Sequence, residues 1–132
     1  ESQEYRDILQ KHELDTIYLA APTSSESRIQ LADRSSTGFL YYVSRTGVTG
    51  AQTDVSQSLD AELAIVRKLV ANPLMIGFGI ANAAQAKEIS RLGDGIVIGS
   101  AIVERIAKHA EADEREESIR SFASTIREAL DA

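Results

Sequence analysis

Two short glycine-containing segments of this 132-residue chain have the composition of an anion-binding site. Residues 95–100 (GIVIGS) form a buried-strand pattern that runs directly into a helix pattern, and residues 77–79 (GFG) end the preceding strand pattern. Glycine lets a ligand approach the backbone, and the first turn of a helix presents unpaired N–H groups that attract phosphate. One such glycine more often only relieves crowding between a strand and a helix. Two successive units that end alike favour a phosphate site at Gly79, Gly99 and Ser100.

A third segment, residues 44–52 (SRTGVTGAQ), follows another strand pattern and is long, polar and interrupted by glycines. This composition suits a lid that closes over a substrate. We expect Gly50 to add a backbone contact to the same phosphate. We expect Arg45, the cation of this segment, to face an anionic ligand. For Arg45, a solvated loop charge is the simpler interpretation.

The segments that follow the strand patterns contain little that can transfer a proton. Barrel active sites lie at the carboxyl ends of strands, and acid–base chemistry there requires a carboxylate, His or Lys. Glu26 is the one candidate, and it falls in an expected first helical turn, where the helix dipole favours an acidic residue. His12 and His109 fall in helical patterns, and no His/Asp/Glu grouping has metal-ligand spacing. We therefore predict phosphate binding, with no catalytic residue and no metal site in this chain.

The elements that position these segments follow from hydrophobic periodicity, which alternates in the order α-βα-βα-βα-βα. Apolar strands joined by helices indicate a parallel sheet covered by helices. Tyr41 and Tyr42 are adjacent on a strand and are expected on opposite faces. The expected strands are residues 17–21, 39–43, 74–80 and 96–98, and the expected helices are 3–12, 26–34, 59–70, 83–92 and 101–132 with a break near 111–113. Asn82 is the expected N-cap of the helix over 83–92.

Four βα units after a leading helix are half the inventory of a (β/α)8 barrel, which has eight such units in about 250 residues. We expect residues 1–132 to form a single domain, half of a (β/α)8 TIM barrel with four parallel strands and covering helices. A small open four-stranded α/β domain is equally compatible with the periodicity alone.

The charge balance and composition exclude several classes of function. The chain has 14 basic and 20 acidic residues, a net charge of −6 and a pI near 4.9, whereas nucleic-acid binders are normally basic. The absence of cysteine rules out disulfides, thiolate nucleophiles and cysteine metal sites. No apolar run approaches the roughly 20 residues of a membrane span, and nothing resembles a signal peptide. We expect a cytoplasmic protein, or a piece of one, that binds neither nucleic acid nor membrane.

Three motifs together resemble a known enzyme family. Residues 44–50 (SRTGVTG), preceded by Tyr41, resemble the signature loop of the tryptophan synthase α chain. Residues 77–80 (GFGI) and 99–103 (GSAIV) follow in the family's order and at similar spacing, and residues 17–22 resemble the family's fifth barrel strand. The SRTGVTG run is specific, whereas the other two motifs occur widely among phosphate-binding barrels. The resemblance covers essentially the whole chain, but only the C-terminal half of the family's barrel.

The resemblance implies a carbon–carbon lyase of tryptophan biosynthesis that cleaves indole-3-glycerol phosphate into indole and glyceraldehyde 3-phosphate. The positions that match the family's phosphate-binding residues are Gly50, Gly79, Gly99 and Ser100. The positions that match its substrate pocket are Leu19, Tyr41, Phe78 and Val97. The closing loop is matched by Arg45 and Thr49.

The same resemblance implies which parts of the enzyme lie elsewhere. The family's catalytic aspartate and glutamate belong to its N-terminal half, so this chain alone is expected to be inactive. The α chain needs no cofactor, because pyridoxal phosphate belongs to the β chain that receives indole. The implied partners are the β chain and either the missing N-terminal half-barrel or a second copy. Two alternatives stay open, namely a non-catalytic half-barrel assembly module with open sheet edges and another phosphate-sugar barrel enzyme, such as an isomerase.

Overall fold

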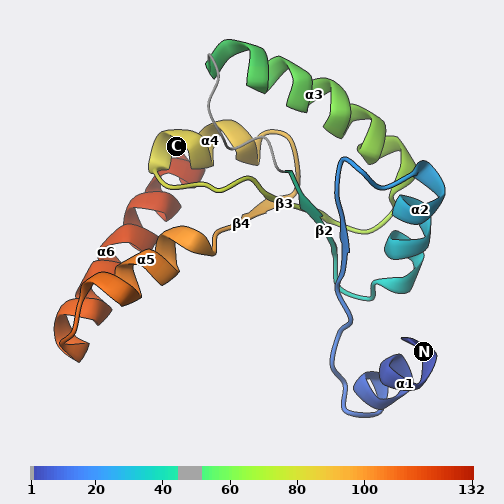
Figure 1. Cartoon of the computed structure of the whole chain (residues 1–132), viewed down its shortest axis with the longest axis horizontal. Coiled ribbons are helices and arrows are strands. Elements are labelled where there is room, and N and C mark those ends of the chain that lie inside the picture. The colour runs from blue at the N-terminus through green and yellow to red at the C-terminus, as the bar shows by residue number, and fades with distance from the viewer. Residues whose placement is uncertain (1, 45–51) are drawn as a thin grey trace.

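The structure is a computed structural model that describes residues 2–44 and 52–132, and it shows a four-stranded sheet with helices on one side (Figure 1). The expected βα alternation is confirmed. The elements in chain order are α1 (Ser2–Lys11), β1 (Tyr18–Ala20), α2 (Glu26–Ser35), β2 (Leu40–Val43), α3 (Gln52–Leu69), β3 (Leu74–Gly77), α4 (Ala83–Ser90), β4 (Gly95–Val97), α5 (Ser100–Lys108) and α6 (Ala112–Asp131).

The sheet is parallel throughout, with the strands in the order β1-β2-β3-β4. This order follows the chain, as expected when each helix returns the chain to the next parallel strand. The register aligns Leu19 with Tyr41, Tyr41 with Met75, and Met75 with Gly95. One row of side chains on the same face therefore crosses all four strands, and both outer strands have a free edge within the described residues.

The two faces of the sheet differ sharply in exposure. On the face beneath the helices, the strand residues Ala20, Leu40, Tyr42, Leu74 and Ile76 are at most 2% exposed. They pack with α3 side chains such as Leu59, Leu63 and Val66 into one core. On the opposite face, Leu19 is 61% exposed. The expected division of the tyrosine pair is confirmed, because Tyr42 lies in the core and Tyr41 lies on the uncovered face.

The buried tyrosine is also tied to the helix above it. The Tyr42 hydroxyl donates a hydrogen bond to the Glu62 carboxylate on α3. Burial, followed by this bond to an acidic group, raises the pKa of Tyr42 well above its usual value. Tyr42 therefore remains a neutral donor at physiological pH and is a core residue rather than an acid–base group.

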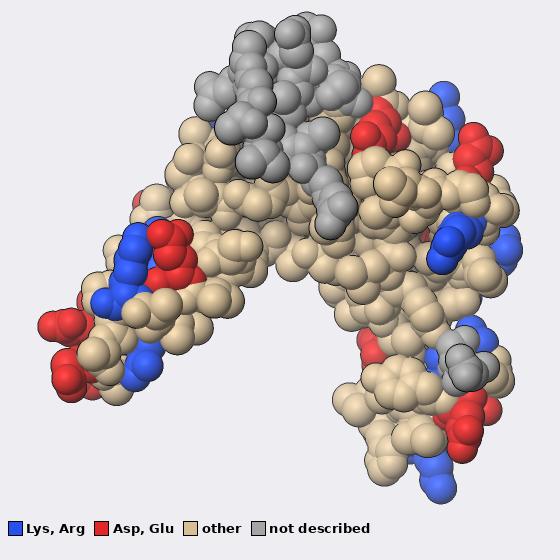
Figure 2. Space-filling view, viewed as in Figure 1, with Lys and Arg blue, Asp and Glu red and all other residues tan. Residues whose placement is uncertain are grey.

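The carboxyl-terminal helices close the other end of the core. Phe122 and Ile126 on α6 are buried in it, and α6 packs against both α4 and α5. The Arg105 guanidinium on α5 lies 3.7 Å from the centroid of the Phe122 ring. In the space-filling view, the molecule is an arch hollowed between the arm formed by α5 and α6 and the arm formed by α1 (Figure 2). None of the helices described here is long and apolar enough to cross a membrane.

Two aspartates hold the amino end of β3, opposite the edge where the glycines lie. The buried Asp33 carboxylate accepts from the backbone N–H groups of Ala71 (3.0 Å) and Asn72 (3.1 Å). Asp94 accepts from the N–H of Leu74 at 2.8 Å and forms a two-pronged ion pair with Arg67. These bonds satisfy backbone donors that the sheet ladder leaves over.

Asp94 makes acid stability testable at this end of the sheet. The Arg67 hydrogen bond, then the Leu74 amide, lower the pKa of Asp94 from 3.8 to about 2. A depressed folded-state pKa adds stability above the unfolded pKa, and this stability is lost as pH falls from about 4 to about 2. Because both side chains are 40% or more exposed, we expect a loss of less than about 1 kcal/mol. Urea midpoints measured against pH should show this loss in the parent chain and a shallower dependence in Asp94→Asn. Equal slopes would contradict the assignment.

The largest errors in the predicted boundaries concern α3, β3 and the two histidines. Helix α3 begins at Gln52 rather than near Leu59, because residues 52–58 (QTDVSQS) contain too few apolar side chains to show helical periodicity. Strand β3 ends at Gly77 rather than Ile80, because Gly79 adopts a φ of +67° that a strand cannot accommodate. His12 follows α1 and His109 follows α5, instead of lying within helices.

Candidate functional site

The glycines singled out in the sequence lie at one edge of the sheet. Gly77 on β3 is paired with Val97 on β4, and Gly79 and Gly99 each follow two residues later. Neighbouring parallel strands are about 4.8 Å apart, so both loops leave the same edge side by side. Gly79, Gly99 and Ser100 are all exposed there. The structure thus brings these three predicted residues to the carboxyl ends of two adjacent strands.

Several backbone N–H groups at this edge have no acceptor among the described residues. Helix α5 starts at once after β4, and the Gly99 carbonyl accepts from Ile102 (2.9 Å) and Val103 (3.1 Å). The amides of Ser100 and Ala101 therefore belong to the first helical turn, which has no intrahelical acceptors. Among the described residues, the amides of Gly79 and Gly99 also have no protein acceptor. This edge offers free donors at the positive end of a helix, which suits a phosphate or another oxyanion.

Space for a ligand is left at both glycines. Among the residues that the structure describes, a Cβ atom built at Gly79 or Gly99 has no heavy atom within 4 Å. The positive φ of Gly79 is a conformation that glycine adopts without a steric penalty. A methyl group at either position would therefore meet no described protein atom.

Three of the four predicted pocket residues lie on the uncovered face of the sheet. Leu19 and Tyr41 share one cross-strand row, and Val97 lies on the next row toward the glycine edge, beside Gly77. Phe78 follows β3 and is half-buried against the core. The face next to the glycine edge is therefore apolar, as a site for a flat hydrophobic group requires.

The ring of Tyr41 packs at a specific position on this face, which the sequence did not predict. A Cβ atom at Gly77 would lie 2.5 Å from the Tyr41 hydroxyl oxygen and 2.7 Å from its Cε2 atom. The ring of Tyr41 therefore lies across the bare backbone of Gly77 on the neighbouring strand. Met75 covers Gly95 in the same way, with its sulfur 2.5 Å from the position of a Cβ. Glycine at 77 and 95 thus allows large side chains to lie flat over the next strand.

The remaining predicted site residues lie outside the described residues. Arg45, Thr49 and Gly50 belong to residues 45–51. The residue before this segment, Ser44, is buried, and its amide donates to the Gly77 carbonyl at 2.9 Å. Ser44 therefore lies at the same edge of the sheet as the glycines.

The described part of the glycine edge carries little acid–base capacity. Glu26 is exposed in the first turn of α2, where the sequence placed it. Over residues 2–44 and 52–132, no group of three or more His, Asp or Glu side chains is arranged to hold a metal ion. What this edge can do chemically is hold an anion by its backbone amides.

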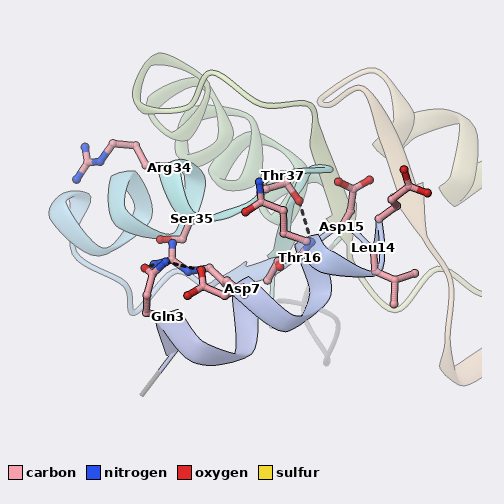
Figure 3. A pocket seen from close by; sticks show the side chains of 11 residues that line it. Gln3, Asp7, Leu14, Asp15, Thr16, Arg34, Ser35 and Thr37 are labelled. Atoms are coloured by element: carbon pink, nitrogen blue, oxygen red, sulfur yellow. Dashed lines mark hydrogen bonds between the residues drawn. The ribbon is translucent and has the colours of Figure 1, made fainter.

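A polar cavity of about 450 Å³ lies at the other end of the sheet, between α1, residues 13–16 and the end of α2. Thr16 and Thr37 line the cavity just before β1 and β2. The Thr37 hydroxyl accepts from the Thr16 N–H, and the Thr16 carbonyl accepts from the Thr37 N–H, both at 2.9 Å. Figure 3 shows Gln3 and Asp7 on α1 and Arg34 turned away from them. Because it lies at the amino ends of the strands, this cavity is separate from the glycine edge.

A second missed residue is Gln85, which contacts the loop after β3. Its side-chain oxygen accepts from the backbone N–H of Ala81 at 2.9 Å, and Asn82 caps α4 by accepting from the Gln85 N–H at 3.0 Å. The sequence predicted Asn82 as the cap. The Gln three residues later was the available signal, because a polar cap followed at that spacing by Glu or Gln marks a capping box.

Four parallel βα units that follow one another in sheet and chain order are the architecture of part of a (β/α)8 barrel. Sequence comparison narrows the class. The sequence model of the family described as tryptophan synthase alpha chain matches residues 1–131. This chain belongs to that family.

Individual relatives agree with this assignment. The tryptophan synthase alpha chain of Geobacter sulfurreducens is 40% identical over 130 residues, which are 98% of this chain and 49% of the relative. That of Solibacter usitatus is 40% identical over 132 residues, which are 100% and 49%. The crystal structure of the alpha subunit from Legionella pneumophila str. Paris superposes with a TM-score of 0.80 at 30% identity, covering 99% of this chain and 48% of that chain. This chain therefore spans about half the length of the relatives it matches, which confirms half of a barrel as its fold.

Proposed function

We propose that this chain is the C-terminal, phosphate-binding half of an α-chain lyase that cleaves indole-3-glycerol phosphate into indole and glyceraldehyde 3-phosphate. The single observation that carries the proposal is the meeting of the β3 and β4 loops at one edge, where the amides of Gly79, Gly99 and Ser100 have no acceptor among the described residues. These amides hold the substrate phosphate, together with Gly50. Leu19, Tyr41, Phe78 and Val97 contact the indole side of the substrate, and Arg45 and Thr49 belong to a closing loop.

Substrate binding and proton transfer fall to different halves of the enzyme. A retro-aldol cleavage requires proton transfer to and from the substrate, and proton transfer requires a positioned acid and base. The described edge offers the exposed Glu26 and no other titratable group in its loops. The catalytic carboxylates are supplied by the N-terminal half, so this chain alone orients the substrate without turning it over.

The uncovered face of the sheet supports the same division. Leu19 is 61% exposed on this face, and Ile17 is 39% exposed just before β1. An apolar face of this kind is normally buried against a partner, and the free edges of β1 and β4 can each pair with one further strand. The N-terminal half-barrel fits both requirements, since the curated relatives are about twice the length of this chain. The complete enzyme works with the β chain, which carries pyridoxal phosphate, in the cytoplasm.

Complementation tests this function. We expect this chain, mixed with the N-terminal half of the Geobacter sulfurreducens relative, to form a complex that releases indole from indole-3-glycerol phosphate. Each half alone should release none above background. Sedimentation of the mixture provides the control for assembly. Cleavage by this chain alone would contradict its inactivity, and a stable complex without cleavage would contradict the lyase assignment. Pairing of this chain with itself, to the exclusion of the other half, would favour the assembly-module alternative.

A further inference from the structure

The loop between β3 and α4 is held by a pair of reciprocal side-chain hydrogen bonds. Asn82 accepts from the backbone N–H of Gln85, and Gln85 accepts from the backbone N–H of Ala81. In the usual capping box, the third helical residue reaches back to the N–H of the cap residue itself. Here Gln85 reaches one residue further, to the last residue of the loop. The bond therefore fixes the loop as well as the helix end.

The fixed residue lies close to the proposed anion site. Ala81 is two residues after Gly79, and the intervening Ile80 is 2% exposed within the core. Gly79 itself is exposed and has a φ of +67°, and no heavy atom of the described residues lies within 4 Å of its Cβ position. Glycine has the widest backbone freedom of any residue. Gly79 thus lies between Phe78, which packs against the core, and its anchored neighbours Ile80 and Ala81.

The helix does not need this bond for its own capping. Asn82 already satisfies an N–H of the first turn of α4, and a hydrogen bond between exposed groups adds little to overall stability because water competes for both partners. Ordering a long exposed side chain such as that of Gln85 also costs conformational entropy. The bond is therefore better suited to ordering the loop than to stabilising the fold.

We propose that Gln85 is a positioning residue for phosphate, acting through the Ala81 amide to hold the Gly79 loop in its binding conformation. This inference rests on the proposed phosphate site. It predicts that loss of the Gln85 side chain loosens the loop, so that phosphate has to order it on binding. Ordering one backbone residue weakens binding by about fivefold or more.

The experiment compares three variants with the parent chain, using inorganic phosphate as the probe. Gln85→Ala should speed hydrogen exchange at the Ala81 amide and raise the calorimetric Kd for phosphate about fivefold. Ser90→Ala is the matched control, because it removes the Ser90 to Lys87 hydrogen bond of 3.0 Å at the opposite end of the same helix. It should leave both readouts unchanged. Gln85→Glu keeps an acceptor for Ala81 and should restore the protection of that amide.

The outcomes separate the two proposals. If the parent chain binds no phosphate, the proposed function loses its site and the inference fails with it. If the parent binds phosphate and Gln85→Ala binds it equally well, the phosphate site stands and the positioning role is overturned. Equal weakening in Gln85→Ala and Ser90→Ala would also overturn it, because the effect would then come from general loss of helix stability.

Discussion

Replacing Ser100 by Asp is expected to weaken the binding of glycerol 3-phosphate by about 100-fold while the chain stays folded. Ser100 is exposed and is the first residue of α5. A carboxylate there would occupy the free amides and repel the phosphate, and two like charges about 4 Å apart near a protein surface repel by about 4 kcal/mol before salt screening. Stability should not fall, because the first turn of α5 has no acidic residue and the helix dipole favours one.

A matched variant isolates the effect of position. Ser27→Asp places the same charge in the first turn of α2, also beyond a strand and also exposed. Ser27 follows β1 in the chain, and β1 is two strands away from β3 in the sheet. Calorimetry should give a near-parental Kd for Ser27→Asp, and thermal unfolding should show both variants folded. If Ser100→Asp bound as tightly as Ser27→Asp, the α5 amides would not hold the phosphate.

Gly77→Ala is expected to destabilise the chain by about 2 kcal/mol, which lies within the range of overpacking substitutions. The added methyl group would meet the Tyr41 hydroxyl at 2.5 Å and its ring at 2.7 Å. Gly77 is buried between neighbouring strands, so its backbone has little freedom to retreat. The ring of Tyr41 would have to move away from Gly77, and the uncovered face of the sheet would change shape as a result.

A double-mutant cycle checks this cause. Tyr41→Leu removes the hydroxyl and the distal ring atoms that approach position 77. In that background, urea unfolding should show that Gly77→Ala costs at least about 1 kcal/mol less than in the parent. The same cost in both backgrounds would place the strain somewhere other than at the Tyr41 ring.

The local sequence pattern was sufficient to predict the strands and helices of this chain and their order. The alternation of apolar runs and helical stripes predicted four parallel βα units, and the adjacency of Tyr41 and Tyr42 predicted their opposite faces. Asn82 was predicted as a helix cap because a cap and its helix are neighbours in the chain. These features depend on residues a few positions apart, where backbone geometry alone sets the relation between side chains.

Two of the features that escaped prediction join residues far apart in the chain. The contact between Tyr41 and Gly77 joins residues 36 positions apart (77 − 41 = 36). The hydrogen bond between Asp33 and Ala71 joins residues 38 positions apart. No periodicity reveals such a contact, because it depends on the register between strands. The start of α3 was missed for another reason. Its first turns contain few apolar side chains, so helix formation there leaves no hydrophobic stripe.

The central claim is that the β3 and β4 loops hold one anion together. An amide-resolved NMR titration of the chain with inorganic phosphate tests it most directly. We expect the N–H signals of Gly79, Gly99 and Ser100 to shift along one common binding curve, while signals around the cavity beside α1 stay in place. Shifts confined to that cavity, or different curves for Gly79 and Ser100, would contradict a shared site.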